Sequence, residues 1–524
     1  MSATPKAKVM TAEQAVALVA TGATVLVDGS GGGVNEPDLL LRALERRFLE
    51  TGEPGDLTVV HPAGIGDGRG GGIDRFAHRG MARRVIGAHW GWSPRLQEMA
   101  REELLEGYCL PQGVMSHLLR AIAAGGPGVI SHIGLGTFVD PRLEGGRLNE
   151  RANEPLVELL ELRGREWLLY SAFPIDVAII RGSWADEHGN LVMDGEGLYA
   201  ETLSAAQAVK NSGGVVLAQV KTIAAKIDPR RVKVPGILVD AVVTHPEQRL
   251  SLATESDATL TGERRTHADG FAPLELTVRK VIARRAAAEL RAGDVANLGF
   301  GMPDGVASVL AEEGAADRVT FTLEQGHIGG VPAAGTDFGM ARNQDAMIDA
   351  GYQFDWYDGG GLDVAVLSFA QIDRAGNVNV SKFGGRAPGI GGFVNISQGA
   401  RRVVFVGTFT AGKQQQFRFD DGLTIERDGT DRKFVESVEQ ISFSAAYARR
   451  WQQSVTYVTE RATFELADDG LVLTEIAPGI DLGRDVLARM DFAPRVSENL
   501  REMDRRLFGH ASTGLGLLTT EAIA

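Results

Sequence analysis

The residue best placed to do chemistry is Glu324, a carboxylate that directly follows a predicted strand. Residues 317–323 have the composition of a strand, and a glycine-rich loop, residues 326–330, comes after the glutamate. In open α/β sheets, ligands bind at the carboxyl ends of the strands. The corresponding strand of the first half of the chain, residues 57–60, leads into His61 and no acid. We predict that Glu324 is functional; the alternative is an ordinary surface glutamate.

A second glycine-rich segment, residues 384–392, follows Lys382. Glycines such as Gly389, Gly391 and Gly392 have no Cβ, so their backbone N–H groups can approach a ligand or a developing oxyanion closely. The same glycines would also suit a loop that only needs positive φ angles. Both interpretations stay open from the residues alone.

Two polar side chains lie in or beside turns. Gln112 lies between a proline and a glycine, and Asn35 lies two residues before Pro37. Either side chain could orient a substrate carboxylate, or could simply close its own turn. Residues 407–413 look like a P-loop, but Gln414 replaces the Ser or Thr that would bind Mg²⁺, so nucleotide hydrolysis is not expected.

The elements that would position these residues occur twice along the chain. Residues 175–190 contain an apolar strand and then an Asp-Glu-His-Gly-Asn turn, and residues 362–377 repeat this pattern with Asp-Arg-Ala-Gly-Asn. A second apolar strand follows each copy at nearly the same offset. Short apolar strands that alternate with helices are typical of parallel α/β sheets. We predict two homologous open α/β domains in tandem, with largely parallel sheets.

The predicted boundary between the two halves is a polar segment without apolar periodicity, residues 251–275. Residues 1–250 then form the N-terminal domain, and residues 276–524 form the C-terminal domain, which carries Glu324. A helix is expected from about residue 274 to residue 291.

Composition excludes several functional classes. The chain has 524 residues, with 54 Lys and Arg against 68 Asp and Glu, and its basic residues are scattered, so no nucleic-acid partner is expected. The one cysteine, Cys109, cannot form an internal disulfide, and no CxxC or HExxH motif indicates a metal site. No apolar run is long enough to span a membrane, and no targeting segment is recognised. We therefore expect a cytoplasmic protein without metal or membrane association.

Four segments give the chain a resemblance to the family I coenzyme A transferases. They are residues 108–113, 323–330, 388–393 and 458–464, and the resemblance spans almost the whole sequence. The chain is most similar to members with two fused subunits, the acetate or propionate CoA-transferases and the acyl-CoA:3-ketoacid CoA-transferases. The resemblance implies two related α/β domains and places the joint of the two subunits at the boundary predicted above.

The resemblance also implies a mechanism. In the family, a strand-end glutamate attacks acyl-CoA, passes through a mixed anhydride and becomes a glutamyl-CoA thioester, which a second carboxylic acid resolves by ping-pong kinetics. Glu324 matches this nucleophile, the Gly391 amide is implied as an oxyanion donor, and Gln112 is implied at the acyl site. CoA is then a substrate and covalent intermediate, and no cofactor is bound permanently. The residues expected to bind CoA are Gly389, Gly392, Lys382 and Asn35.

One departure from the family bears on the substrate. Several 3-ketoacid transferases have an asparagine after the first-half strand as a second oxyanion donor, whereas Pro62 follows His61 here and has no N–H to donate. The leading prediction is transfer of CoA from a short-chain acyl-CoA to acetate, propionate or a similar acid. An acyl-CoA hydrolase that uses the same glutamate is an alternative, and a non-catalytic acyl-CoA or sugar-phosphate sensor is an alternative of another class.

Two further expectations concern charge and assembly. CoA carries phosphates, so a protein of net charge −14 needs local cations, and Arg83, Arg84 and Lys382 are candidates. The resemblance implies a homodimer or a homotetramer. The sequence leaves the preferred acyl chain and the physiological acceptor open.

Overall fold

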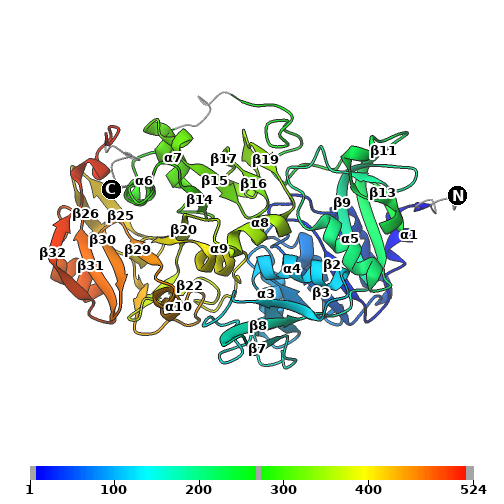
Figure 1. Ribbon diagram of the computed structural model, residues 1–524, viewed down its shortest axis with the longest axis horizontal. Helices are drawn as coiled ribbons and strands as arrows, with labels where there is room; N and C mark the ends of the chain where they lie inside the picture. The colour runs from blue at the N-terminus through cyan, green and yellow to red at the C-terminus, as the bar shows by residue number, and fades with distance from the viewer. Residues whose placement is uncertain (1–7, 267–272, 515–524) are drawn as a thin grey trace.

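Two ten-stranded sheets form the framework of the computed structural model, which describes residues 8–266 and 273–514 (Figure 1). All strands of the first sheet come from residues 8–244, and all strands of the second come from residues 295–502. The first sheet lies on the right of Figure 1 and the second on the left. The α/β fold predicted from the sequence is confirmed.

The first sheet contains eight strands in which every neighbouring pair is parallel. A short strand, β10 (Leu191–Val192), adds antiparallel to one of them and pairs with β12 (Val232–Val234). In order across the sheet, the eight strands are β1 (Lys8–Val9), β13 (Ala241–Thr244), β11 (Val215–Ala224), β9 (Val177–Asp186), β2 (Thr24–Val27), β3 (Leu57–His61), β4 (Ala82–Gly87) and β5 (Glu106–Cys109).

The second sheet has a parallel centre of five strands with antiparallel pairing on both sides, and the last two strands of the sheet pair in parallel. In order, its strands are β19 (Ala346–Met347), β16 (His327–Ile328), β15 (Thr320–Leu323), β14 (Val295–Leu298), β20 (Val364–Ser368), β23 (Arg402–Val406), β29 (Ser454–Val458), β30 (Ala462–Ala467), β31 (Gly470–Ile476) and β32 (Arg495–Glu502). The predicted strand 317–323 is shorter at its start, because residues Ala316–Arg318 form a helical turn and pairing with β14 begins at Thr320.

The two sheets share one plan. The order β3-β2-β9-β11-β13 in the first sheet matches the order β15-β14-β20-β23-β29 in the second. The Asp176 carboxylate accepts a hydrogen bond from the Thr24 N–H at 2.8 Å, and the Asp363 carboxylate accepts one from the Val295 N–H at 3.0 Å. The first aspartate of the sequence repeat therefore has the same task in both halves, which is to fix the start of the neighbouring strand.

The second aspartate of the repeat closes a turn. Asp186 accepts a hydrogen bond from the Asn190 side chain at 2.8 Å, and Asp373 accepts one from the Asn377 side chain at 3.0 Å. The glycine between them has a positive φ in both turns. These repeated polar residues are structural and lie outside the lining of the cavity described below.

Helices from both halves pack against one another in the middle of the molecule. Helix α4 (Gln112–Ala123) contacts α5 (Thr202–Asn211) of its own half, and also α8 (Ala350–Asp358) and α9 (Phe393–Gly399) of the other half (Figure 1). One continuous hydrophobic core contains buried side chains of both halves. The remaining helices are α1 (Ala12–Val16), α2 (Asp38–Thr51), α3 (Pro94–Arg101), α6 (Val278–Ala287), α7 (Gly305–Glu312) and α10 (Ala445–Arg450).

Helix α6 is shorter than the helix expected over residues 274–291. It begins after Thr277, because the Leu274 carbonyl accepts a hydrogen bond from the Lys280 ammonium instead of a helical N–H. At the other end, the Arg291 N–H donates to the Asp294 carboxylate, which starts a turn into β14.

The described chain also contains smaller sheets of two or three strands. Strands β6 (Gly128–Ser131), β8 (Arg165–Ser171) and β7 (Val157–Leu162) form an antiparallel sheet in the part of the first half between α4 and β9. The others are β17 (Val331–Pro332) with β18 (Ala341–Arg342), β21 (Gln371–Asp373) with β22 (Val378–Asn379) and β28 (Phe434–Val435), β24 (Thr410–Ala411) with β27 (Asp431–Arg432), and β25 (Gln416–Phe419) with β26 (Leu423–Arg427).

The predicted linker, residues 251–275, lies between the strands of the two sheets. Its described part, residues 251–266, has no helix or strand and is attached to both halves. The Leu252 N–H donates to the Gly32 carbonyl at 2.8 Å, whereas Thr254 donates to Asp337 at 2.9 Å and the Thr266 N–H donates to Asn343 at 2.8 Å. Residues 267–272 lie outside the described part of the chain. The boundary of two domains at this segment stays a prediction.

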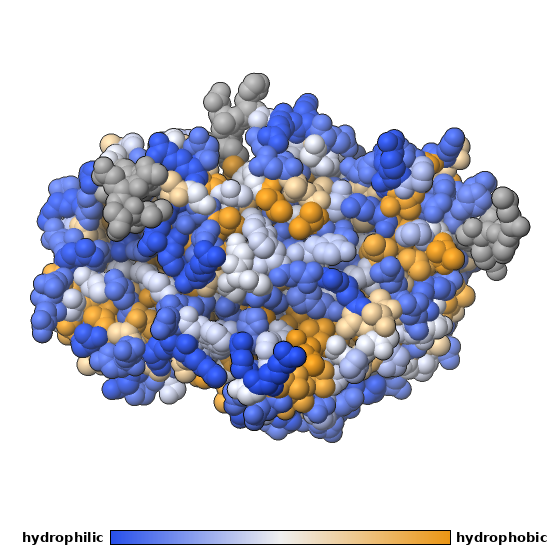
Figure 2. All heavy atoms as spheres, viewed as in Figure 1, coloured by the Kyte–Doolittle hydropathy of each residue, from blue (hydrophilic) through white to orange (hydrophobic). Residues whose placement is uncertain are grey.

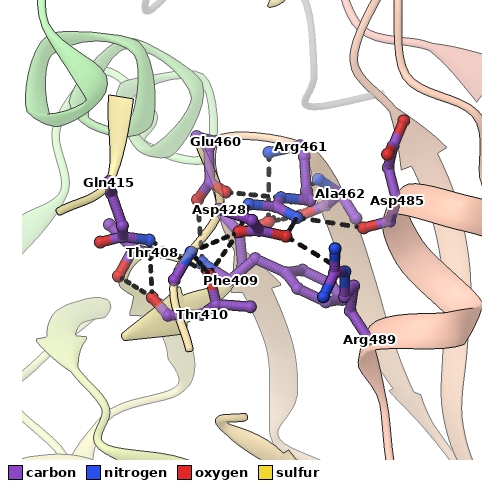
Figure 3. A network of polar contacts seen from close by, with 12 residues as sticks. Thr408, Phe409, Thr410, Gln415, Asp428, Glu460, Arg461, Ala462, Asp485 and Arg489 are labelled. Atoms are coloured by element: carbon purple, nitrogen blue, oxygen red, sulfur yellow. Dashed lines mark hydrogen bonds and ion pairs between the residues drawn. The ribbon is translucent and has the colours of Figure 1, made fainter. Parts of the chain in front are cut away.

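The segment around Glu460 and Arg461, which carries part of the family resemblance, is a buried charge network (Figure 3). Arg461 donates to Glu460 at 2.7 Å and forms two hydrogen bonds with Asp428, at 2.9 and 2.7 Å. The Glu460 carboxylate accepts the Phe409 N–H at 2.9 Å, which ties the loop after β23 to the start of β30. Neither Glu460 nor Arg461 lines the cavity described below, so we assign this network to structure.

The surface is mixed in character. Figure 2 shows hydrophilic residues over most of one face, with hydrophobic patches between them. Among the described residues, no helix combines the length and the apolarity needed to cross a bilayer.

Candidate active site

A cavity of about 540 Å³ lies between the two halves, at the carboxyl ends of strands from both sheets. In the first half it is lined by residues that follow β2, β3 and β4, and in the second half by residues at or after the ends of β14, β15 and β20. This is the edge at which open α/β sheets bind ligands. The polar and aromatic residues of the lining are Ser30, His89, Trp92, Gln112, Asn297, Phe300, Glu324, Gln325, Phe338, Ser368, Phe383 and Phe393.

Glu324 is held at the end of β15 by a tight turn. The Gly326 N–H donates to the Leu323 carbonyl at 3.0 Å, and the chain returns as β16, antiparallel to β15. Gly326 has a φ of 109°, and a Cβ there would lie 3.0 Å from the Ile348 carbonyl carbon and overlap its oxygen. Only glycine fits this turn. The turn directs the Glu324 carboxylate into the cavity.

The cavity changes the acidity of Glu324. Burial raises the pKa of the carboxyl from 4.5 to about 7, although hydrogen bonds from the Gln325 amide and the Gly392 N–H act in the opposite direction. The Gln325 Nε2 lies 3.2 Å from Glu324 Oε1. A desolvated carboxylate is a stronger nucleophile than a hydrated one, and at neutral pH a large fraction of this group is ionised.

The glycine loop that precedes α9 is fixed by the first half of the molecule. The Ile390 N–H donates to the Ala88 carbonyl at 2.9 Å, and the Trp90 N–H donates to the Pro388 carbonyl at 2.7 Å. Gly389 adopts a φ of 75°, and a Cβ on it would lie 2.8 Å from the Ala88 oxygen. The two chain segments therefore lie too close together for any other residue at this position.

Of the two glycines at the end of this loop, Gly392 faces the carboxylate. The Gly391 N–H, implied above as an oxyanion donor, donates to the Ala88 carbonyl at 2.8 Å and so is already paired. The Gly392 N–H donates to Glu324, and a Cβ on Gly392 would overlap Glu324 Oε2. Gln112 lines the same cavity, and its N–H donates to the Gly391 carbonyl at 3.0 Å.

Two predicted CoA-binding residues lie elsewhere. Asn35 is buried and does not line the cavity; its side-chain amide is 3.5 Å from Thr202 Oγ1, and its left-handed φ of 55° fits the turn interpretation. Lys382 is exposed and also does not line the cavity, although the next residue, Phe383, does. Lys382 is thus next in sequence to the cavity lining without being part of it.

The two arginines considered for phosphate binding are at the wrong end of the sheet. Arg83 and Arg84 lie near the start of β4, and both form ion pairs with Glu106, at 3.4 and 2.6 Å. The cavity lies beyond the other end of β4, about 16 Å away at ~3.3 Å per strand residue. These side chains stabilise the edge of the first sheet.

Three titratable side chains of the first half are uncharged at neutral pH: His89, which lines the cavity, and His61 and Cys109, which do not. Burial lowers the pKa of both His61 and His89 to about 4, so both rings are uncharged at neutral pH. Burial raises the pKa of the Cys109 thiol to about 12, which keeps it protonated and unreactive. His61 Nδ1 lies 2.8 Å from the Ala63 carbonyl, across Pro62, so this strand end supplies no evident replacement for an asparagine amide.

Sequence reasoning missed the aromatic residues of the cavity. Trp92, Phe300 and Phe338 come from three separate loops, and their rings form a chain with centroid distances of 6.5 Å (Trp92 to Phe300) and 5.1 Å (Phe300 to Phe338). No short motif marked them. Asn297 was also missed, although a polar residue inside the buried strand β14 was a signal; its side chain donates to the Thr322 carbonyl at 3.2 Å.

Within the described ranges, no group of three or more His, Cys, Asp or Glu side chains could hold a metal ion. The arrangement instead offers one activated carboxylate, one backbone N–H beside it and a neutral, partly aromatic cavity. Such a site can attack a carbonyl carbon and stabilise the covalent product without a metal.

Known proteins resemble this chain over nearly its full length. Residues 9–245 match the family model described as coenzyme A transferase. The chain is 45% identical over 519 residues to the caffeate CoA-transferase of Acetobacterium woodii, with 97% of this chain and 99% of that protein covered. It is 42% identical over 512 residues to the acetate CoA-transferase YdiF of Escherichia coli K12, with 97% and 96% covered.

A solved structure agrees with the predicted fold and with a thioester intermediate. The crystal structure of the acyl-CoA transferase YdiF from E. coli O157:H7, in a thioester complex with CoA, superposes with a TM-score of 0.93 at 41% identity and covers 98% of both chains. At this coverage the match includes both sheets. The resemblance inferred from the sequence is thus confirmed, and the chain belongs to the coenzyme A transferase family, whose members transfer CoA through a covalent thioester.

Proposed function

We propose that Glu324 is the nucleophile on which this CoA-transferase forms its glutamyl-CoA thioester. The observation that carries the proposal is the position of its carboxylate, which lies in a desolvated cavity between the two halves and accepts a hydrogen bond from the Gly392 N–H. No second carboxylate lines this cavity in the described part of the chain.

Each half-reaction then consists of two acyl transfers. The Glu324 carboxylate attacks the thioester carbonyl carbon of an acyl-CoA, the C–S bond breaks, and CoA leaves as a thiolate, so that the acyl group and Glu324 form a mixed anhydride. The thiolate next attacks the carbonyl carbon of Glu324, and the original acid leaves as its carboxylate. An acceptor carboxylate repeats these steps in reverse order and receives the CoA. One thioester is exchanged for another, so little free energy is lost.

The backbone would stabilise the negative charge that develops in these steps. The Gly392 N–H is aimed at the Glu324 carboxyl group, where an oxyanion forms when CoA attacks the anhydride. Gln112, on the opposite side of the Gly391 peptide, supplies a side-chain amide to the same cavity. We therefore assign the oxyanion role to Gly392 and keep Gln112 as an acyl-site residue.

Transfer is favoured over hydrolysis because Glu324 is only partly exposed and its carboxylate lies within the cavity between the two halves. The lining around it consists of glycines, apolar and aromatic side chains, neutral polar side chains and one uncharged histidine, His89. In such a site, an organic acid that fills the cavity reaches the thioester more readily than bulk water does. We propose acetate, propionate and similar acids as acceptors, with the acetate and caffeate transferases as the most informative relatives.

The test is to incubate the full chain with acetyl-CoA and no acceptor, and to measure the intact mass and a peptide map. We expect one CoA on the peptide that contains Glu324, and no CoA on the Glu324→Gln variant. Addition of propionate should discharge the adduct as propionyl-CoA, whereas steady release of free CoA thiol without any acid would indicate a hydrolase. Full transfer activity in Glu324→Gln would overturn the assignment of the nucleophile.

Three broader expectations are part of the same proposal. We propose that the chain works in the cytoplasm as a homodimer or homotetramer, and that residues 251–275 join two domains related to separate subunits. The buried, protonated Cys109 is compatible with any redox environment. Analytical ultracentrifugation of the full chain measures the assembly, and a single species of monomer mass would contradict this part of the proposal.

A further inference from the structure

We infer that the cavity selects acyl groups with an uncharged, apolar tail and rejects acyl groups that carry a second carboxylate. This inference rests on the proposed function and specifies its substrate class. It follows from the residues that line the cavity, from the acids that lie behind this lining, and from the position of the aromatic wall formed by Trp92, Phe300 and Phe338.

The first argument is the absence of a cation. Among the described residues that line the cavity, none is Lys or Arg, and His89 is neutral. The acyl group and the pantetheine arm both have to reach Glu324, so both lie in this cavity. Whichever part of it the acyl tail occupies, no Lys or Arg of the described lining is there to pair with a carboxylate. A carboxylate buried without a partner is strongly disfavoured, because desolvation is not repaid by an ion pair.

The second argument is that the groups behind the cavity lining are acids. Asp28 and Glu201 are both buried; Thr202 donates to Asp28 at 2.6 Å and Ser116 donates to Glu201 at 2.5 Å. Burial, together with the charges of Asp28 and Glu324, raises the pKa of Glu201 to about 8, so this carboxyl is largely protonated at neutral pH. Neither acid supplies the positive charge that a second carboxylate on the substrate would need.

The third argument is the shape of the apolar wall. Phe338 and Phe300 meet edge to face, and Trp92 continues the wall toward the first half. Phe338 stands near the reacting group, because the next residue, Gly339, packs on Gln325: a Cβ on Gly339 would lie 3.3 Å from Gln325 Cδ. Gln325 in turn donates to Glu324. An apolar tail bound to Glu324 would therefore contact Phe338.

The decisive experiment compares two acyl groups of equal length. Butyryl-CoA and succinyl-CoA both carry four acyl carbons and differ at the tail, which is a methyl group in one and a carboxylate in the other. With the wild-type full chain and acetate as acceptor, we expect kcat/KM for butyryl-CoA to exceed that for succinyl-CoA by at least about 100-fold. Equal values, or values within tenfold, would overturn the inference.

The outcome separates this inference from the proposed function. If neither butyryl-CoA nor acetyl-CoA leaves CoA on Glu324, the proposed function fails. If both do, and succinyl-CoA reacts as well as butyryl-CoA, the proposed function stands and only the selection by charge is wrong.

A pair of variants tests the position of the tail. Phe338→Arg places a cation at the wall, and Phe338→Met removes the ring without adding charge. Position 338 is partly exposed and lies in a loop, so both variants are expected to fold. We expect the ratio of succinyl-CoA to butyryl-CoA activity to rise at least tenfold in Phe338→Arg relative to Phe338→Met. An unchanged ratio would refute contact between Phe338 and the tail.

Discussion

Gly392→Ala is the sharpest test of the catalytic geometry, because it adds a single methyl group at a known place. Gly392 has a φ of −82°, which alanine adopts without strain, so the backbone need not change. Its Cβ, however, would lie 3.0 Å from Glu324 Cδ and would overlap Oε2. The substitution therefore acts on the position of the Glu324 carboxylate and leaves the Gly392 N–H in place.

The size of the effect follows from the displacement. Non-bonded carbon and oxygen atoms approach to roughly 3.3 Å, so the carboxylate has to move by about 1 Å or turn away from the N–H. A misplacement of ~1 Å can cost about 100-fold in rate, or ~2.7 kcal/mol of transition-state stabilisation. We expect the free energy of unfolding to change by less than about 1 kcal/mol, since no backbone strain is added.

The assay is the rate at which acetyl-CoA loads CoA onto the enzyme in a single turnover, measured by rapid quench and intact mass. Gly509→Ala is the matched control, because Gly509 has a φ of −90°, close to that of Gly392, does not line the cavity, and an added Cβ would lie no closer than 3.8 Å to its nearest neighbour, the Arg506 carbonyl oxygen. We expect the control to load at the wild-type rate. A Gly392→Ala enzyme that also loads at the wild-type rate would refute our placement of the carboxylate.

Further predictions concern pH and the charge network. The pKa of Glu324 is raised to about 7 by burial, and only the ionised carboxylate attacks, so the loading rate should rise with pH through about 7 and then level off; a flat profile from pH 5 to 9 would count against this. The same shift stabilises the folded state at low pH. Its contribution is fully present below the unfolded value of 4.5 and is lost as the pH rises through about 7, so denaturant titrations should show Glu324→Gln gaining stability relative to wild type over that range. In the network of Figure 3, Asp428→Asn leaves the buried Arg461 without its bidentate partner and should destabilise the fold by about 3 kcal/mol. The control Asp420→Asn breaks an exposed ion pair with Arg418 and should cost less than about 1 kcal/mol; equal losses for the two variants would contradict the role of burial. Burial acts to raise the pKa of Asp428, but hydrogen bonds from Arg461 and Thr410 outweigh it and hold it at about 2, so this contribution should be lost only as the pH falls from about 4 through 2.

The sequence by itself determined the duplicated α/β plan and the identity of the central carboxylate. Apolar strand patterns are local, and the repeat of residues 175–190 at 362–377 was visible because both copies keep the same turn and the same strand-starting aspartate. Glu324 was identifiable because a strand end and a glycine loop frame it in one continuous stretch. Each of these signals spans fewer than about twenty residues.

Only the tertiary structure decided which groups meet that carboxylate. Gly391 and Gly392 are adjacent in sequence, yet the Ala88 carbonyl, about three hundred residues away, takes the N–H of the first and leaves that of the second for Glu324. The aromatic wall likewise joins Trp92 of one half to Phe300 of the other. No pattern in a single segment encodes such a contact, because it depends on how the helices and loops of two separately specified halves pack together. That packing makes a neutral, largely apolar cavity around one charged residue.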